Sequence, residues 1–278
     1  MLNKPIIVVA GEPYSVFLEI FFKANKNFNF KKPIILIASK KLLIEQMKKL
    51  NFNFKINLVD ENESNFSNLN NKNINLIDVE FKFNRTFDKI SNKSNLYISK
   101  CFEIALELLK KKKFSGLING PISKKHFLKG KFLGITEYLA KKTINSNKFA
   151  MLIFNKNLSV SPMTTHLALK DVNKSITKKN IYNQVDLITK FYKERFKRKP
   201  NIAITGLNPH CESNFKNSEE VTTIIPAINQ IKSKNFRISG PFPADTIFLK
   251  ENLKKFDVVI GMYHDQVLSP IKALFGFD

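Results

Sequence analysis

Three of the four histidines follow predicted strands, where a parallel sheet would bring them to one edge. His166 follows Met-Thr-Thr, His210 follows Leu-Asn-Pro and His264 follows Met-Tyr. Neutral imidazoles bind Zn²⁺ and similar divalent ions, and three histidines with an open position are typical of a catalytic metal centre. The spacing is compatible with one metal site, or with three unrelated imidazoles, because a lone histidine is more often an ordinary core or surface residue. His126 is interpreted as a surface residue.

Charged residues near these histidines could complete an active site. Asp265 adjoins His264, and Asp245 lies in the proline-rich segment Gly-Pro-Phe-Pro-Ala-Asp. Carboxylates near a metal orient its ligands or move protons. Lys272 could pair with a phosphate, although each of these residues taken alone would more often be an ordinary surface charge. The first strand is not followed by a G-x-G-x-x-G fingerprint, so these residues alone leave the reaction open.

Apolar patterning predicts the elements that must position these residues. Helices are expected near residues 16–23, after Ser39, and at 96–110, 181–196 and 226–232; strands are expected at 5–10, 33–38, 116–118, 149–154, 201–205 and 256–261. Alternation of strands and helices predicts a parallel α/β sheet with helices on both faces. Ligands of such sheets bind beyond the carboxyl ends of the strands.

Composition narrows the class of protein. The chain has 278 residues and a net charge of +23, from 46 basic and 23 acidic residues. The lysines are spread along the chain, which argues against a specific nucleic-acid role but favours anionic ligands. No apolar run is long enough for a membrane span, and the N-terminus lacks a secretory pattern, so a cytoplasmic protein is expected. Two cysteines are too few for a disulfide framework, and Cys101 is predicted to be a buried free thiol.

Six short motifs occur in an order that resembles the 4-hydroxythreonine-4-phosphate dehydrogenase family of pyridoxal phosphate biosynthesis. They are Asn119–Lys124, Gly134–Ala140, Thr164–Leu169, Gly206–His210, Gly240–Thr246 and Met262–Gln266. The resemblance implies an isocitrate/isopropylmalate-dehydrogenase-like fold of two α/β/α lobes with the active site between them. Residues 1–118, with about 237–278 returning to them, are expected to form one lobe, and residues 119–236 the metal-binding and dimer-forming lobe.

The resemblance also implies an activity. A homodimer would oxidise 4-phosphooxy-L-threonine with NAD or NADP, and the 3-oxo acid would lose CO₂ to give 3-amino-2-oxopropyl phosphate. One divalent ion (Zn, Mg, Mn or Co) would be held by His166, His210 and His264, with His264 supplied by the neighbouring subunit. The metal would chelate the substrate and lower the pKa of its 3-hydroxyl. Thr136 and Lys272 match substrate-contacting positions, while Asp245 and Asp265 are candidates for orienting ligands or relaying a proton.

The sequence departs from the family in the turn after the first strand, where Tyr14 to Phe17 replace the family's glycines, in Cys211-Glu-Ser after His210, and in two further places. Ile135 stands where the family usually has a histidine, so a substrate contact is lost or supplied by another residue. The chain stops at Asp278, and the resemblance implies that family members continue for roughly one more strand and helix. These departures leave two alternatives open: a related dehydrogenase of another phosphorylated hydroxy acid, and an inactive fragment.

Overall fold

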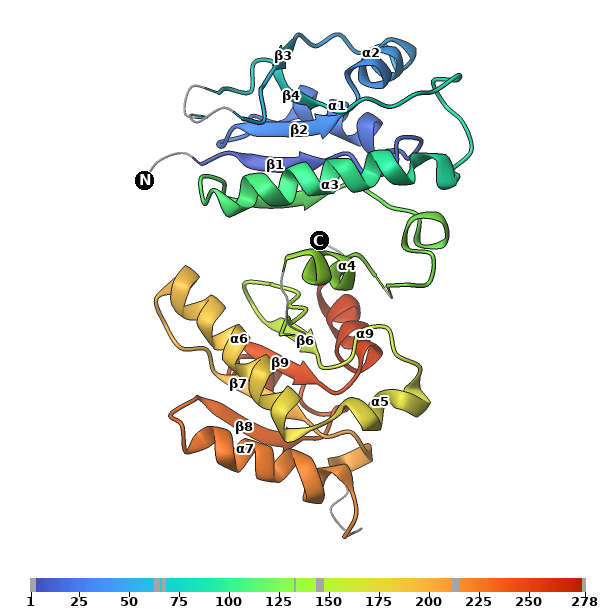
Figure 1. The fold of residues 1–278 in the computed structure, drawn as a ribbon. Helices are drawn as coiled ribbons and strands as arrows, with labels where there is room; N and C mark the ends of the chain where they lie inside the picture. Colours follow the sequence, from blue (N-terminus) through green and yellow to red (C-terminus); the bar gives the residue numbers. More distant parts are fainter. Residues whose placement is uncertain are drawn as a thin grey trace. The chain divides into compact units, whose positions relative to one another are not determined.

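The computed structural model describes residues 4–62, 66, 69–132, 134–143, 148–211 and 216–276, so that Phe277 and Asp278 lie outside the described residues. The chain divides into two compact units, Met1–Ile135 and Thr136–Asp278. Each unit has its own parallel sheet, which is described separately below (Figure 1).

The sheet of the first unit runs in the order β3-β4-β2-β1-β5, with all neighbouring strands parallel. Its strands are β1 (Ile6–Val9), β2 (Ile34–Ala38), β3 (Ile56–Leu58), β4 (Ile74–Asp78) and β5 (Gly116–Asn119). The sequences Ile-Ile-Val-Val and Ile-Ile-Leu-Ile-Ala form central strands because both faces of this sheet are covered and every side chain can be buried.

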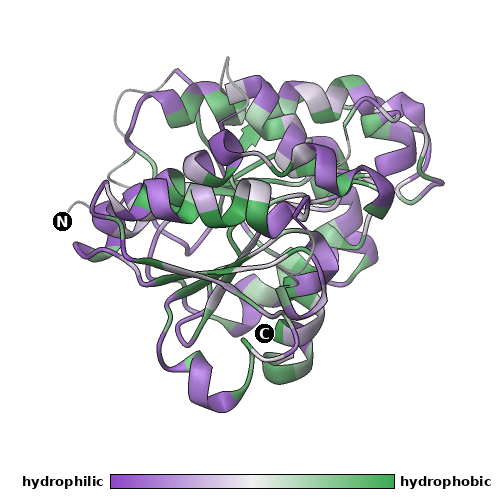
Figure 2. Ribbon diagram, turned by 90° about the horizontal axis from the view of Figure 1, so that it is seen from below, coloured by the Kyte–Doolittle hydropathy of each residue, from purple (hydrophilic) through white to green (hydrophobic). Residues whose placement is uncertain are grey.

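Helices cover both faces of that sheet. They are α1 (Phe17–Asn27), α2 (Lys40–Lys49) and α3 (Asn95–Lys110). Side chains of α1 and α2 pack with Val8 and Leu36 in one cluster, while α3 contacts β1, β2 and β5. Ser39 caps α2, as expected, because its Oγ accepts the Leu42 N–H at 3.4 Å. Figure 2 shows that hydrophobic and hydrophilic residues alternate along the helices of the chain.

The second unit repeats this arrangement with other elements. Its sheet runs β6-β9-β7-β8, all parallel, and comprises β6 (Ser159–Pro162), β7 (Ile202–Thr205), β8 (Ile238–Phe242) and β9 (Val258–Gly261). Its helices are α4 (Ile135–Thr143), α5 (Leu169–Ser175), α6 (Lys178–Phe196), α7 (Ile225–Lys232), α8 (Lys250–Leu253) and α9 (His264–Phe275). One core cluster joins α6 and α7 to the sheet, and another joins α9 to it. The predicted two-unit α/β/α fold class is therefore confirmed.

The two units differ from the expected lobe boundaries in two respects. Residues 237–278 do not return to the first unit, because β8 pairs with β7, and β9 lies between β6 and β7 in the second sheet. The buried Val258, Val259 and Ile260 fit this central position, where both faces are covered. The division also falls after Ile135 rather than after residue 118.

The strand predicted at residues 149–154 is also wrong. Only Ile153 makes an isolated antiparallel bridge there, with Val160, and the strand of the sheet is β6. The sequence of β6, Ser-Val-Ser-Pro, does not indicate a buried strand because serine is polar. Ser159 and Ser161 are nevertheless both 0% exposed. Their hydroxyls are satisfied inside the unit, Ser159 by Tyr192 at 3.1 Å and Ser161 by Gln184 at 2.6 Å.

Cys101 is buried and unpaired, which confirms the prediction of a free thiol. Burial raises the pKa of the Cys101 thiol to about 12, so it is not a reactive nucleophile near neutral pH. Within the part of the chain that the structure describes, no helix combines the length and the apolar character that crossing a bilayer would require.

Asp257, immediately before β9, makes contacts whose contribution to the stability of the second unit can be measured. Its carboxylate accepts from both Nη atoms of Arg198, at 2.8 and 2.7 Å, and from the Asn201 N–H at 2.7 Å. Burial opposes ionisation, but these bonds prevail and hold the pKa of Asp257 below its ordinary value. We expect Asp257→Ala to lower the free energy of unfolding by about 1–3 kcal/mol at pH 7, measured by urea denaturation.

The same variant should show a defined pH dependence. Because the pKa of Asp257 is lower in the folded state, its stabilisation is complete above the ordinary value of about 4 and disappears as the pH falls through the folded value. Wild type and variant should therefore converge only in acid. Asp171→Ala serves as the control, since it removes an exposed helix pair with Lys174 and should cost much less. Equal losses in the two variants would contradict the assignment.

Candidate functional site

The loops that follow β6, β9 and β7 carry the three predicted metal ligands. His166 lies just beyond β6, His264 opens α9 directly after β9, and His210 lies beyond β7. These strands are neighbours in one parallel sheet, so their carboxyl ends meet at the same edge. The second unit thus supplies all three loops from one edge of its sheet.

Two of the histidines lie side by side within one chain. The ring centroids of His166 and His264 are 5.8 Å apart, and the rings are inclined by 35°. Their side chains remain 31% and 32% exposed, so both imidazoles can still reach a ligand. This proximity is observed within a single chain. The supply of His264 by a neighbouring subunit stays a prediction.

Each predicted histidine has a carboxylate oxygen near its Nδ1 atom. The distances are 2.7 Å from His264 to Asp265, 3.4 Å from His166 to Glu137 and 3.7 Å from His210 to Asp245. A carboxylate on one ring nitrogen fixes the orientation of the ring and leaves Nε2 for a metal, which is the usual arrangement around metal-bound histidines. Asp265 is therefore close enough to orient the His264 ring, whereas 3.7 Å is too long for a hydrogen bond between His210 and Asp245.

His210 is not drawn into the His166–His264 pair. It adopts a left-handed backbone conformation, with φ 56°, and its side chain is 73% exposed. Among the described residues, no group of three or more His, Cys, Asp or Glu side chains is close enough to hold a metal ion. The donor types fit a divalent ion and the rings of His166 and His264 are adjacent, but the three-histidine site stays a prediction.

Glu137 contacts His166 and Thr165, and no residue pattern in the sequence indicated this carboxylate. Its Oε1 accepts the Thr165 hydroxyl at 2.5 Å, while its Oε2 is buried without a hydrogen-bond partner. Burial raises the pKa of Glu137, but the hydrogen bonds from Thr165 and His166 outweigh it, and the net pKa lies below the ordinary value. Glu137 follows Thr136 in one family motif, and that adjacency is the signal that could have revealed it.

The loop that carries His210 is held by a buried carboxylate. Glu220 is 0% exposed, and its Oε1 accepts the N–H groups of Leu207 at 2.7 Å and Asn208 at 2.9 Å. Burial raises the pKa of Glu220, but these bonds prevail and lower it overall, so the carboxylate stays ionised at neutral pH. A Cβ on Gly206 would lie 2.8 Å from the Cys211 sulfur and 2.9 Å from Glu220, so no larger residue fits there without displacement.

The two predicted substrate contacts lie on helices of the same unit. Thr136 is half-buried in the first turn of α4, one residue before Glu137. Lys272 is exposed on α9, about 12 Å along the helix axis from His264 at 1.5 Å per residue. Their contacts with a substrate remain predictions.

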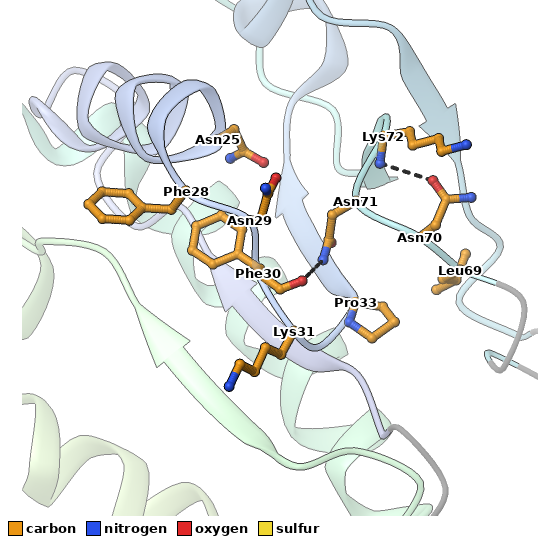
Figure 3. A pocket seen from close by; sticks show the side chains of 10 residues that line it. All are labelled: Asn25, Phe28, Asn29, Phe30, Lys31, Pro33, Leu69, Asn70, Asn71 and Lys72. Carbon is orange, nitrogen blue, oxygen red and sulfur yellow. Dashed lines mark hydrogen bonds between the residues drawn. The ribbon is translucent and has the colours of Figure 1, made fainter.

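A cavity in the first unit is a poor candidate for the same chemistry. It has a volume of about 380 Å³ and is lined by Asn25, Phe30, Asn71 and Lys72 among others. Figure 3 shows its side chains around the start of β2, where the Asn71 amide donates to the Phe30 carbonyl. This is the amino-terminal end of the strand, opposite to the edge at which parallel sheets bind ligands.

Comparisons with known proteins support the family resemblance that the motifs indicate. The family model described as pyridoxal phosphate biosynthetic protein PdxA matches residues 29–278. A 4-hydroxythreonine-4-phosphate dehydrogenase of a Sulfurihydrogenibium species is 34% identical over 279 residues, covering 97% of this chain and 83% of the relative. The Aquifex aeolicus enzyme of that name is 32% identical over 287 residues, covering 100% and 85%.

Solved structures give the same result. The crystal structure of a 4-hydroxythreonine-4-phosphate dehydrogenase from Burkholderia phymatum matches with a TM-score of 0.80 at 25% identity, covering 98% of this chain and 84% of that one. The fold is therefore shared over nearly the whole length of this chain.

Glu220 generates a prediction about the His210 loop. We expect Glu220→Ala to lower the free energy of unfolding by about 2–4 kcal/mol, because each buried polar group left without a partner costs about 1–3 kcal/mol. Urea denaturation at pH 7 would measure it. Glu219→Ala is the matched control, because it removes only an acceptor of the Asn208 side chain and should cost less than about 1 kcal/mol. Similar losses at the two positions would show that Glu220 does not support the loop.

Proposed function

The chain belongs to the pyridoxal phosphate biosynthetic protein PdxA family, and on that premise we propose that it works as a 4-hydroxythreonine-4-phosphate dehydrogenase. It is an oxidoreductase acting on a CH–OH group. Its substrate is 4-phosphooxy-L-threonine, oxidised with NAD or NADP to 2-amino-3-oxo-4-phosphooxybutanoate, which decarboxylates to 3-amino-2-oxopropyl phosphate. The observation that carries the proposal is the position of the three motif histidines beyond the carboxyl ends of β6, β9 and β7, each with a carboxylate oxygen within 4 Å of its Nδ1 atom.

The metal would be held by Nε2 atoms of His166, His210 and His264. A divalent ion (Zn²⁺, Mg²⁺, Mn²⁺ or Co²⁺) acts, when bound, as a Lewis acid that lowers the pKa of a hydroxyl it contacts. The chain prepares for this with Glu137 and Asp265, which orient the two neighbouring rings through Nδ1. Because Glu137 remains ionised at neutral pH, it favours the tautomer of His166 in which Nδ1 carries the proton and Nε2 is free.

Residues beside the metal ligands would handle the substrate and its proton. Thr136 lies next to Glu137, and its hydroxyl can donate to a phosphate oxygen, as can the Lys272 ammonium. Ile135, which precedes Thr136, can do neither, so its side chain supplies no polar contact at the position where the resemblance implies a histidine. Asp245 and Asp265 are exposed by 58% and 79%, which lets either carboxylate exchange a proton with solvent. The dinucleotide, when bound, accepts the two electrons of the oxidation.

The rest of the proposal concerns the setting of the enzyme. The net charge of +23 attracts phosphorylated anions such as this substrate and NAD, without a role for nucleic acid or membrane. We place the protein in the cytoplasm, because both cysteines are unpaired, as is usual in a reducing compartment. We also propose a homodimer, in which a second copy contributes His264 to the metal site.

The activity itself is the first test. Wild-type protein should reduce NAD in the presence of 4-phosphooxy-L-threonine and a divalent ion, followed by absorbance, and EDTA should abolish the rate. His166→Ala and His264→Ala should each lower kcat by at least about 100-fold, since each removes a metal ligand. His126→Ala is the control, because His126 lies in the other unit beside Asn92 and should keep wild-type activity. Turnover of a phosphorylated sugar acid alone would overturn the proposed substrate.

Mixing two inactive variants tests the shared site. If each site takes His166 from one subunit and His264 from the other, a mixed dimer of His166→Ala and His264→Ala contains one intact site. Random reassembly of equal amounts should then restore about one quarter of wild-type activity, because half of the dimers are mixed and half of their sites are intact. If all ligands come from one chain, no activity returns, and the proximity of the two rings in one chain is the functional arrangement.

A further inference from the structure

Gln266 connects two of the loops that carry the histidines. This residue lies in the first turn of α9, two positions after His264, and is 9% exposed. Its Oε1 accepts the Met262 N–H at 2.7 Å, beyond the end of β9, and the Thr205 hydroxyl at 2.8 Å, at the end of β7. Its Nε2 donates to the Gly206 carbonyl at 2.8 Å. One side chain thus bonds to the main chain on both sides of the β9–β7 boundary.

The third loop joins the same network through Met262. The Thr164 hydroxyl, two residues before His166, donates to the Met262 carbonyl at 2.9 Å. The Met163 N–H donates to the Gly261 carbonyl at 2.7 Å. Met262 therefore donates its N–H to Gln266 and accepts a hydrogen bond from Thr164 in the His166 loop. A displacement of Met262 would affect both Gln266 and the His166 loop.

The space around Gln266 leaves little room for another arrangement. A Cβ on Gly261 would lie 3.1 Å from Gln266 Oε1 and 2.4 Å from the Val267 side chain, so the first turn of α9 packs directly on the end of β9. On the β7 side, the residues after Gly206 are held by Glu220. A carboxamide is the one neutral side chain of this length that offers an acceptor for two donors and a donor of its own.

We propose that Gln266 is a positioning residue that sets the spacing between the loops of His166, His210 and His264. It touches neither substrate nor metal. It acts by fixing Gly206 and Met262 relative to each other, and through them the backbone from which the imidazoles project. This inference rests on the proposed metal site. Within one chain, Gln266 links the loops of His166 and His210, which one subunit supplies to a site, to the loop from which His264 would reach the site of the partner.

The first unit offers a matched control. Asn75 is also a buried carboxamide, 3% exposed, and also makes three hydrogen bonds. Its Nδ2 donates to the carbonyls of Ile34 at 3.0 Å and Asn70 at 2.8 Å, and its Oδ1 accepts from Asn57 at 3.0 Å. Replacing either amide by an apolar side chain of similar size removes comparable bonds, but only Gln266 is joined to the histidine loops.

The experiment compares Gln266→Met, Thr205→Val and Asn75→Leu with the wild-type chain. Zn²⁺ affinity is measured by competition with a chromogenic chelator, well below the unfolding temperature. Gln266→Met should bind Zn²⁺ about 10–100-fold more weakly, the range found when residues that orient metal ligands are removed. Thr205→Val, which loses one of the three bonds, should show a smaller loss, and Asn75→Leu should match wild type. Wild-type affinity in Gln266→Met would overturn the proposal.

Hydrogen exchange separates this inference from the metal site itself. If wild-type protein takes up no Zn²⁺, the proposed metal site is wrong, and exchange of the amides of residues 205–211 then decides about Gln266. Faster exchange there in Gln266→Met than in Asn75→Leu supports the positioning role. Equal rates in the two variants reject it, whatever the metal does.

Discussion

Parallel pairing forces the ends of β6, β9 and β7 to one edge of a sheet, and the backbone groups exposed at that edge must find hydrogen-bond partners. Backbone, side chains or water can satisfy such groups, and this chain uses a few buried polar residues for several of them. Gln266 and Thr164 bond across the strand ends, while Glu220 holds the turn after β7. The histidines project from segments that these bonds hold, so satisfaction of the backbone and placement of the site are one problem.

The carboxylates at Nδ1 address a second requirement. A partner at Nδ1 holds an imidazole ring so that its Nε2 can face a metal, and Asp265, Glu137 and Asp245 each lie within 4 Å of the Nδ1 atom of one histidine. The three differ in exposure. Glu137 is 15% exposed and bonded to Thr165, whereas Asp245 is 58% exposed and beside the left-handed His210. The carboxylate beside His166 is therefore the more buried and the more fully hydrogen-bonded of these two.

Sequence patterns predicted the strands and helices that local apolar periodicity identifies. They missed features that depend on contacts between residues distant in the sequence. The run Ile6–Val9 and the amphipathic helix α3 could be read directly, because continuous or periodic apolar residues identify buried faces. Strand β6 could not, since its buried serines look polar until Tyr192 and Gln184 are placed beside them. The motif histidines were found by type and order, but Glu137 and Gln266 act through contacts over distances in sequence that no local pattern records. The sheet to which residues 237–278 belong was missed for the same reason.

Each unit buries its own core, and every predicted site residue lies in the second unit. Natural selection should consequently act differently on substitutions in the first core and on substitutions near the predicted site. A change inside the first core acts on how many copies of the chain survive as folded protein, a quantity that expression level can offset. A change at the carboxyl ends of β6, β9 and β7 can, besides any loss of stability, displace an imidazole in every folded copy, and no increase in abundance restores that position. The two halves of the chain would therefore tolerate substitutions on different terms over evolutionary time.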